Sequence, residues 1–218
     1  MLMKEKLRFS GGFRMKKIFL ASSFKDVADV FKSFAGNVEG KTVTFIPTAS
    51  VVEKVNFFVK SGRKALEKMG MIVDELEVST AASKDIANKL AKNDYIYITG
   101  GNTFFLLQEL KRSGADKIII EQVNAGKLYI GESAGAMVAS ANIEYAGAMD
   151  SVKKAPDLEN FCGLGLTDFY TVPHHTNAPF KKAVEKIKEQ YSSSLTLYPI
   201  SNKEAVWVNG DDIETNSN

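Results

Sequence analysis

Residues 127–140 read Lys-Leu-Tyr-Ile-Gly-Glu-Ser-Ala-Gly-Ala-Met-Val-Ala-Ser, a short apolar run, then Gly-x-Ser-x-Gly, then small residues. The apolar run predicts a buried strand, and the small residues predict a closely packed helix behind it. A strand that turns sharply into a helix at a serine strains the serine backbone, and glycines on either side remove side chains that would clash. This stretch therefore predicts Ser133 as a nucleophile at the end of a strand. The alternative is that Ser133 only caps the helix.

Short β-branched or aromatic runs alternate with longer segments of helical spacing around this stretch. The alternation predicts parallel strands joined by crossover helices, which is an α/β fold. The expected strands are 16–21, 42–47, 71–77, 94–99, 127–130, 195–200 and 205–208. The expected helices are 52–69, 103–112, 115–124 and 180–191. Open sheets of this class bind ligands at the carboxyl ends of their strands, so we expect the site there.

The charge balance argues against a dedicated nucleic-acid binder, because 28 Lys and Arg oppose 26 Asp and Glu, a net charge of +2. A content of 44% hydrophobic and 25% charged residues is typical of a globular protein. We expect residues 15–218 to form a single α/β domain. Residues 1–14 lack periodicity and are expected to be a leader outside the fold, either an upstream start or a cloning remnant.

The chain has one cysteine, Cys162, which cannot form an internal disulfide or supply a thiolate metal cluster. A reducing cytosol is the simplest compartment for such a chain, and Cys162 is expected to be a buried apolar residue. No apolar run approaches the ~18 residues that span a bilayer. We therefore expect a cytoplasmic protein, a monomer or homodimer, with no membrane or nucleic-acid partner.

Two glycines follow the expected strand 94–99, in the sequence Thr-Gly-Gly-Asn-Thr at residues 99–103. Acyl transfer needs two preorganised N–H donors for the developing oxyanion, and a glycine loop can present one of them. We expect the N–H groups of Gly101 and of Ala134, which follows the serine, to form this pair. A tight turn in which Asn102 or Thr103 caps the next helix is an equal alternative on these residues alone.

The protein has only two histidines, His174 and His175, within the sequence Pro-His-His-Thr-Asn at residues 173–177. A nucleophilic serine needs a base that titrates near neutral pH, and histidine has that property. Neighbouring side chains of an extended segment point in opposite directions, so one histidine is expected to face the site. Metal binding is disfavoured because there is no third histidine.

Three motifs, residues 100–103, 131–136 and 173–177, resemble in order and spacing those of peptidase E (alpha-aspartyl dipeptidase) and the cyanophycinases, peptidase family S51. The resemblance runs from Met15 to about residue 210. It implies a three-layer, flavodoxin-like fold of the class I glutamine amidotransferase kind, with no cofactor. It also implies Ser133 as nucleophile, His174 as base and His175 as a structural residue.

The resemblance implies an acidic third member of a catalytic triad, and Asp150 is the first choice because it follows the serine at the family's interval. Asn202 and Glu204 are the alternatives, since the family also places an acid before its last strands. An asparagine could accept a hydrogen bond from the imidazole but would stabilise the imidazolium less than a carboxylate.

The expected function is that of a serine-type, peptidase E-like dipeptidase that cleaves a short peptide or small amide through an acyl-enzyme. Residues 178–183 depart from the family pattern, so a strict aspartyl preference is not expected. Phe57 and Phe58 are interpreted as core residues. Two alternatives stay open: an esterase of the α/β-hydrolase type, and a non-catalytic module that binds a small ligand.

Overall fold

The computed structural model describes residues 15–218 and contains a seven-stranded, mostly parallel sheet in the order β3-β2-β4-β5-β1-β8-β9. The predicted leader, residues 1–14, lies outside the described residues. The five parallel strands are β1 (Lys17–Ala21), β2 (Thr42–Ile46), β3 (Ile72–Glu75), β4 (Tyr95–Ile98) and β5 (Leu128–Glu132). The predicted α/β fold class is confirmed.

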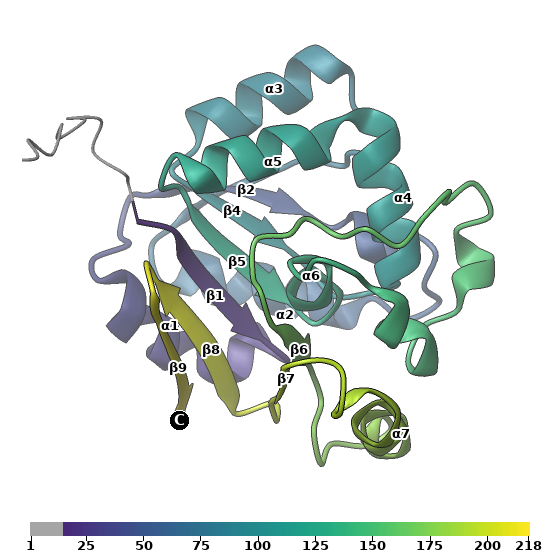
Figure 1. Ribbon diagram of the computed structural model, residues 1–218. Coiled ribbons are helices and arrows are strands. Elements are labelled where there is room, and N and C mark those ends of the chain that lie inside the picture. Colours follow the sequence, from purple (N-terminus) through teal and green to yellow (C-terminus); the bar gives the residue numbers. More distant parts are fainter. Residues whose placement is uncertain (1–14) are drawn as a thin grey trace, which may run out of the picture.

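Helices cover both faces of this sheet (Figure 1). One face packs against α3 (Ser83–Lys92), α4 (Thr103–Ser113), α5 (Ala115–Asn124) and α6 (Ala134–Val138). The other face packs against α1 (Ala28–Ala35) and α2 (Phe57–Lys68). Because both faces are covered, β1 and β5 are almost wholly buried, as expected for parallel strands.

The last third of the chain completes the sheet and adds a small second one. The antiparallel strands β8 (Glu204–Asn209) and β9 (Asp212–Ser217) extend the main sheet beyond β1. The strands β6 (Tyr170–Val172) and β7 (Leu197–Pro199) form a separate parallel pair, joined by helix α7 (Lys181–Tyr191). The 3-10 turns are η1 (Phe24–Val27), η2 (Thr48–Ser50), η3 (Glu144–Ala148) and η4 (Val152–Lys154).

The predicted helix over 52–69 is wrong in its first part, because α2 begins only at Phe57. Its N-terminal neighbours instead form an irregular loop in which Val51 and Val55 are exposed. Strand β9 was not expected, since its side chains are mostly exposed and lack an apolar alternation.

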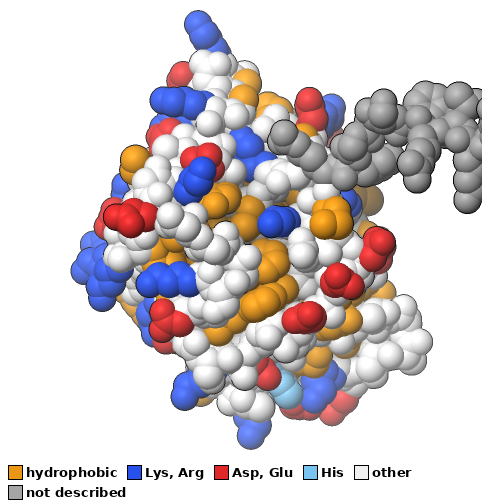
Figure 2. Space-filling model, turned by 90° about the vertical axis from the view of Figure 1, so that its left-hand side faces the viewer, with side chains coloured by type: hydrophobic (Ala, Val, Ile, Leu, Met, Phe, Trp, Pro, Cys, Tyr) orange, Lys and Arg blue, Asp and Glu red, His pale blue; other side chains and the backbone are white. Residues whose placement is uncertain are grey.

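The surface drawn in Figure 2 mixes basic and acidic side chains with a band of hydrophobic ones. Within residues 15–218, every helix is too short or too polar to cross a bilayer.

Candidate active site

The Gly-Glu-Ser-Ala-Gly turn joins β5 to α6 at the carboxyl edge of the sheet. Ser133 occupies it with φ 50° and ψ −107°, a conformation that non-glycine residues rarely adopt. Its N–H donates to the Ala21 carbonyl at 2.8 Å, which ties the turn to the end of β1. Such strain persists only where the surrounding structure enforces it.

The glycines around Ser133 are required by close backbone packing. A Cβ atom on Gly131 would lie 2.5 Å from the Gly135 carbonyl oxygen, and one on Gly135 would lie 2.3 Å from that of Ile98. Both distances are shorter than any real Cβ contact, and the opposing atoms are backbone that cannot swing aside. The turn therefore accepts no side chain at either position, as the sequence motif predicts.

The structure brings Ser133, His174 and Asn202 into one hydrogen-bonded line. The Ser133 Oγ lies 2.9 Å from the His174 Nε2, and the His174 Nδ1 lies 2.9 Å from the Asn202 Oδ1. An amide oxygen can only accept, so Nδ1 carries the proton and Nε2 is left to accept from the serine hydroxyl. This is the tautomer that a general base needs.

Long-range contacts position His174. Its backbone has φ 64°, and its N–H donates to the Ser22 Oγ at 2.9 Å, while the Ser22 hydroxyl donates to the Ile200 carbonyl at 2.9 Å. Asn177 accepts from the Asn202 N–H through its side-chain oxygen at 2.9 Å. The histidine is thus fixed by the residues that follow β1 and by those that follow β7. Sequence reasoning missed Ser22, whose one signal was its place directly after a predicted strand.

The environment of His174 favours the neutral imidazole. Burial lowers the pKa of His174 below its ordinary value, and the hydrogen bond to Asn202 opposes this only in part. The Phe180 ring stacks on the imidazole with 4.7 Å between the ring centroids. At neutral pH the side chain is therefore ready to accept a proton.

Asp150 is not brought to His174, which differs from the prediction. Its carboxylate accepts from the Thr103 N–H at 2.9 Å and from the Thr103 hydroxyl at 2.6 Å, at the first turn of α4. An acid in this position stabilises the N-terminus of a helix. Burial raises the pKa of Asp150, and the bonds from Thr103 oppose the rise. Glu204 is also elsewhere, because its carboxylate accepts from the Ser201 N–H at 2.7 Å.

The two predicted oxyanion donors lie at adjoining strand ends. Gly101 has φ 137°, and a Cβ there would lie 2.1 Å from the Ala49 carbonyl oxygen, so only glycine fits. Gly100 packs against Ser133, since a Cβ on it would lie 3.2 Å from the Ser133 Cβ. Among residues 15–218, neither the Gly101 nor the Ala134 N–H donates to a backbone carbonyl in a turn or loop.

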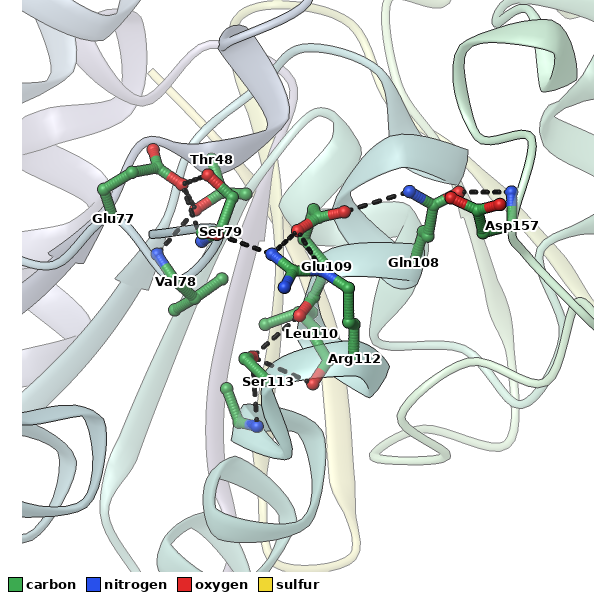
Figure 3. Close-up of polar contacts among 11 residues, drawn as sticks. Thr48, Glu77, Val78, Ser79, Gln108, Glu109, Leu110, Arg112, Ser113 and Asp157 are labelled. Carbon is green, nitrogen blue, oxygen red and sulfur yellow. Dashed lines mark hydrogen bonds and ion pairs between the residues drawn. The ribbon is translucent and has the colours of Figure 1, made fainter. Parts of the chain in front are cut away.

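Polar contacts link helix α4, which follows the Gly101 turn, to neighbouring loops (Figure 3). Glu77 accepts from the Thr48 hydroxyl at 2.7 Å, and Arg112 on α4 donates to the Ser79 carbonyl. On the other side of α4, Gln108 accepts from the Asp157 N–H at 2.9 Å. Helix α4, which begins directly after the glycine turn, is thereby held from two sides.

Glu132, beside Ser133, is buried and was not identified from the sequence. Its carboxylate accepts from the Phe24 N–H at 2.8 Å and from the Tyr97 hydroxyl at 2.7 Å. Burial raises the pKa of Glu132 to about 7, an effect that these two hydrogen bonds oppose. Glu132 ties the end of β5 to the segment after β1 and to β4.

Ser133 and His174 lie in a cleft of about 650 Å³ at the carboxyl ends of the parallel strands. Its size is in the range of small-molecule sites. Phe57 and Phe58 line this cleft, and 67% of Phe57 is exposed, so their interpretation as core residues is wrong. Among the described residues, no cluster of three or more His, Cys, Asp or Glu could hold a metal ion.

The other singled-out residues lie away from the serine. His175 Nε2 is 3.7 Å from the Glu185 carboxylate on α7, and this histidine does not line the cleft. Cys162 is exposed, so the expectation that it is buried is wrong; the segment around it runs along the surface as an irregular loop.

Comparison with known proteins gives a consistent result. Residues 17–216 match the sequence profile described as peptidase family S51. An uncharacterized peptidase of Listeria monocytogenes, Lmo0363, is 57% identical over 92% of this chain and 98% of its own, and Peptidase E of Pasteurella multocida is 29% identical over 92% and 81%. A crystal structure of a protein provisionally called Peptidase E, from Listeria monocytogenes, superposes with a TM-score of 0.90 at 55% identity, covering 94% of this chain and 99% of the other.

Proposed function

The chain belongs to peptidase family S51, and we propose that it is a serine-type peptidase that hydrolyses short peptides through an acyl-enzyme on Ser133. The observation that carries the proposal is the line from the Ser133 Oγ through the His174 ring to the Asn202 Oδ1, with 2.9 Å at each step. The strained backbone at Ser133 supports it, since strain of this kind gathers at functional sites.

Acylation begins when the Ser133 Oγ attacks the substrate carbonyl carbon and the hydroxyl proton passes to the His174 Nε2. The carbonyl oxygen becomes an oxyanion that accepts from the N–H groups of Gly101 and Ala134. The C–N bond then breaks, and the imidazolium returns its proton to the leaving amine. The acyl group is left as an ester on Ser133.

Deacylation repeats the sequence with water in place of serine. His174 takes a proton from the water as its oxygen attacks the ester, and the proton returns to the Ser133 Oγ as the C–O bond breaks. Asn202 orients the imidazole throughout by accepting from Nδ1–H. A neutral amide stabilises the imidazolium less than a carboxylate, so most of the transition-state stabilisation rests on the oxyanion donors.

Two other functions were left open by the sequence. The match to a peptidase family favours amide over ester chemistry, and a comparison of amide and ester turnover separates the two. A non-catalytic binding module has no use for a base whose pKa burial holds below the ordinary histidine value, next to a strained serine. Peptide hydrolysis therefore accounts for more of the site than either alternative.

Labelling with a fluorophosphonate tests the proposal. The wild-type protein should label stoichiometrically, with the adduct mapped to Ser133 by mass spectrometry. Ser133→Ala should abolish labelling, and His174→Ala should slow it by about 10²-fold or more, the range of general-base contributions. Ser33→Ala, on the outer surface of α1, is the matched control and should label like the wild type.

Peptide turnover by the same variants completes the test. Ser133→Ala should lose at least about 10³-fold in kcat because it removes the nucleophile. Hydrolysis at the wild-type rate in Ser133→Ala, or a wild-type protein that neither labels nor cleaves any peptide, would overturn the proposed mechanism.

A further inference from the structure

The cleft beside Ser133 has an apolar wall that the catalytic steps do not use. Phe58, Met149 and Phe180 line it and are partly exposed, and the more exposed Phe57 is the first residue of helix α2. The buried Met137 also borders the cleft. These side chains come from separate segments of the chain. Apolar side chains that gather in a cleft and stay accessible to solvent indicate a surface for an apolar ligand group.

Among residues 15–218, every lysine that lines the cleft is paired with a carboxylate. Two lysines line it, and each pairs with a carboxylate: Lys25 with Asp26, and Lys154 with Glu53 at 2.7 Å. The other titratable acids in the lining are Glu132 and Asp150, held by the hydrogen bonds described above. Among the described residues, no arginine lines the cleft.

The pair of Glu53 and Lys154 joins two loops across this cleft. Glu53 follows η2 on one side, and Lys154 ends η4 on the other. The side chains are 26% and 34% exposed, so salt screens their attraction less than at an open surface. Glu53 thereby neutralises the one lysine of the cleft whose partner comes from a distant part of the chain.

An acidic substrate side chain meets two obstacles here. It must displace Glu53 from Lys154, and it must then lie near carboxylates of its own sign, which repel it. A neutral apolar side chain meets neither obstacle and gains the area of the aromatic and methionine wall.

We propose that the site prefers peptides whose acyl residue, the one that Ser133 attacks, has an uncharged apolar side chain, and that Glu53 sets this preference by neutralising Lys154. The inference rests on the proposed function, since it specifies the substrate class of the same site. Glu53 is a specificity-determining residue and takes no part in the proton transfers.

Aminoacyl-p-nitroanilides of Leu, Met, Asn and Asp test this directly. Wild-type kcat/KM should be highest for the Leu and Met substrates, lower for Asn and lowest for Asp. The Asn and Asp side chains are similar in size, so the ratio of their kcat/KM values reports the effect of charge. Glu53→Gln leaves Lys154 unpaired, so the Asp-to-Asn ratio of kcat/KM should rise about tenfold. Adding Lys154→Met to Glu53→Gln should remove that gain.

Two further variants complete the set. Glu67→Gln removes one negative charge from α2 outside the cleft and should leave the Asp-to-Asn ratio unchanged. Lys154→Met alone leaves Glu53 unpaired and should lower the ratio, which keeps the proposal testable if Glu53→Gln does not fold.

The outcomes separate this inference from the proposed function. If Ser133 labels with the fluorophosphonate but the Asp substrate is cleaved as well as the Leu substrate, the substrate class is wrong and the peptidase mechanism stands. An active Glu53→Gln with an unchanged ratio would remove Glu53 from its role. If Ser133 does not label and no anilide is cleaved, both proposals fail together.

Discussion

The serine turn (residues 131–135) and the histidine turn (residues 173–177) meet at one hydrogen bond but are built in opposite ways. The serine turn is short-range: a strand, a strained serine and two glycines packed on backbone neighbours produce its shape. The histidine turn is held by side chains from remote segments, Ser22 after β1 and Asn202 after β7. Both turns contain a non-glycine residue with positive φ, Ser133 in one and His174 in the other.

Because the two turns are held in different ways, substitutions in them should affect stability and activity differently. In the serine turn, a side chain added at a glycine pushes neighbouring backbone segments apart. Such a substitution should therefore lower the free energy of unfolding as well as the activity. In the histidine turn, loss of one remote hydrogen bond leaves the fold largely intact but frees the imidazole. Substitutions there should act mainly on kcat.

The largest effect is expected from Gly135→Ala, because the new Cβ would lie 2.3 Å from the Ile98 carbonyl oxygen. Relieving this overlap should cost about 3 kcal/mol of stability and move Ser133, so kcat should fall as well. Thermal unfolding and peptide turnover measure the two effects. Gly147→Ala is the control, since a Cβ there meets nothing within 4 Å. A Gly135→Ala protein with wild-type Tm and kcat would show that the serine turn tolerates a side chain.

The second-largest effect is expected from removing the side-chain amide of Asn202, which orients the His174 ring. Asn202→Ala leaves the His174 Nδ1–H without its acceptor, so kcat should fall by about 10²-fold with little change in Tm.

Asn202→Asp keeps an acceptor in place and adds a negative charge that stabilises the imidazolium. Turnover by Asn202→Asp should be higher than that by Asn202→Ala. The added charge should also raise the pKa of His174 above its value in the wild type. Since the base must be neutral, activity is lost as pH falls through that pKa, and the acid limb of kcat/KM should move to higher pH than in the wild type. In the wild type that limb should lie below the ordinary histidine value, because burial lowers the pKa of His174. An unmoved acid limb in Asn202→Asp would contradict the proposed role of Asn202.

A smaller effect is expected from Ser22→Ala. The hydroxyl accepts from the His174 N–H and donates to the Ile200 carbonyl, which also accepts from the His175 N–H. Its loss therefore leaves the His174 N–H without its acceptor, while the Ile200 carbonyl keeps one donor. We expect kcat to fall about tenfold, with a stability loss of about 1–3 kcal/mol. Ser194→Ala, at an exposed position after α7, should match the wild type in both measurements. An unchanged kcat in Ser22→Ala would mean that the histidine turn is held without this contact.

The smallest effect is expected from Glu132→Gln. In the wild type, burial raises the pKa of Glu132 from 4.5 to about 7, so between these values the folded protein keeps a proton that the unfolded chain has released. The free energy of unfolding therefore falls as pH rises through this window.

A glutamine at position 132 can still form hydrogen bonds with the Phe24 N–H and the Tyr97 hydroxyl. It carries no charge, so its burial does not depend on pH in this range. The difference in Tm between the variant and the wild type should therefore increase from pH 5 to pH 8. Each kcal/mol of difference in the free energy of unfolding corresponds to about 2–4 °C in a chain of this size. Glu189→Gln, on the exposed side of α7, is the control. A pH-independent difference in Tm would show that Glu132 is ionised throughout.

The parallel core was predictable because most of its strands are apolar runs, and β2, β4 and β5 end close to a glycine or proline. The start of α2 was not predictable, since Val55 fits the helical pattern of 52–69 by spacing alone but lies exposed in the loop before α2. Strand β9 gave no signal because an exposed edge strand needs only backbone pairing with β8.

By itself, the sequence determined the serine turn, because its shape depends on local backbone geometry. It also limited the candidates for a base to two histidines, because the chain contains no others. Only the tertiary structure decided which polar side chain reaches the His174 Nδ1. Asp150 and Asn202 both follow Ser133 along the chain at a plausible interval, but the first lies at the N-terminus of α4 and the second beside the imidazole. Contacts between such distant residues depend on how the whole sheet packs, and sequence spacing does not encode them.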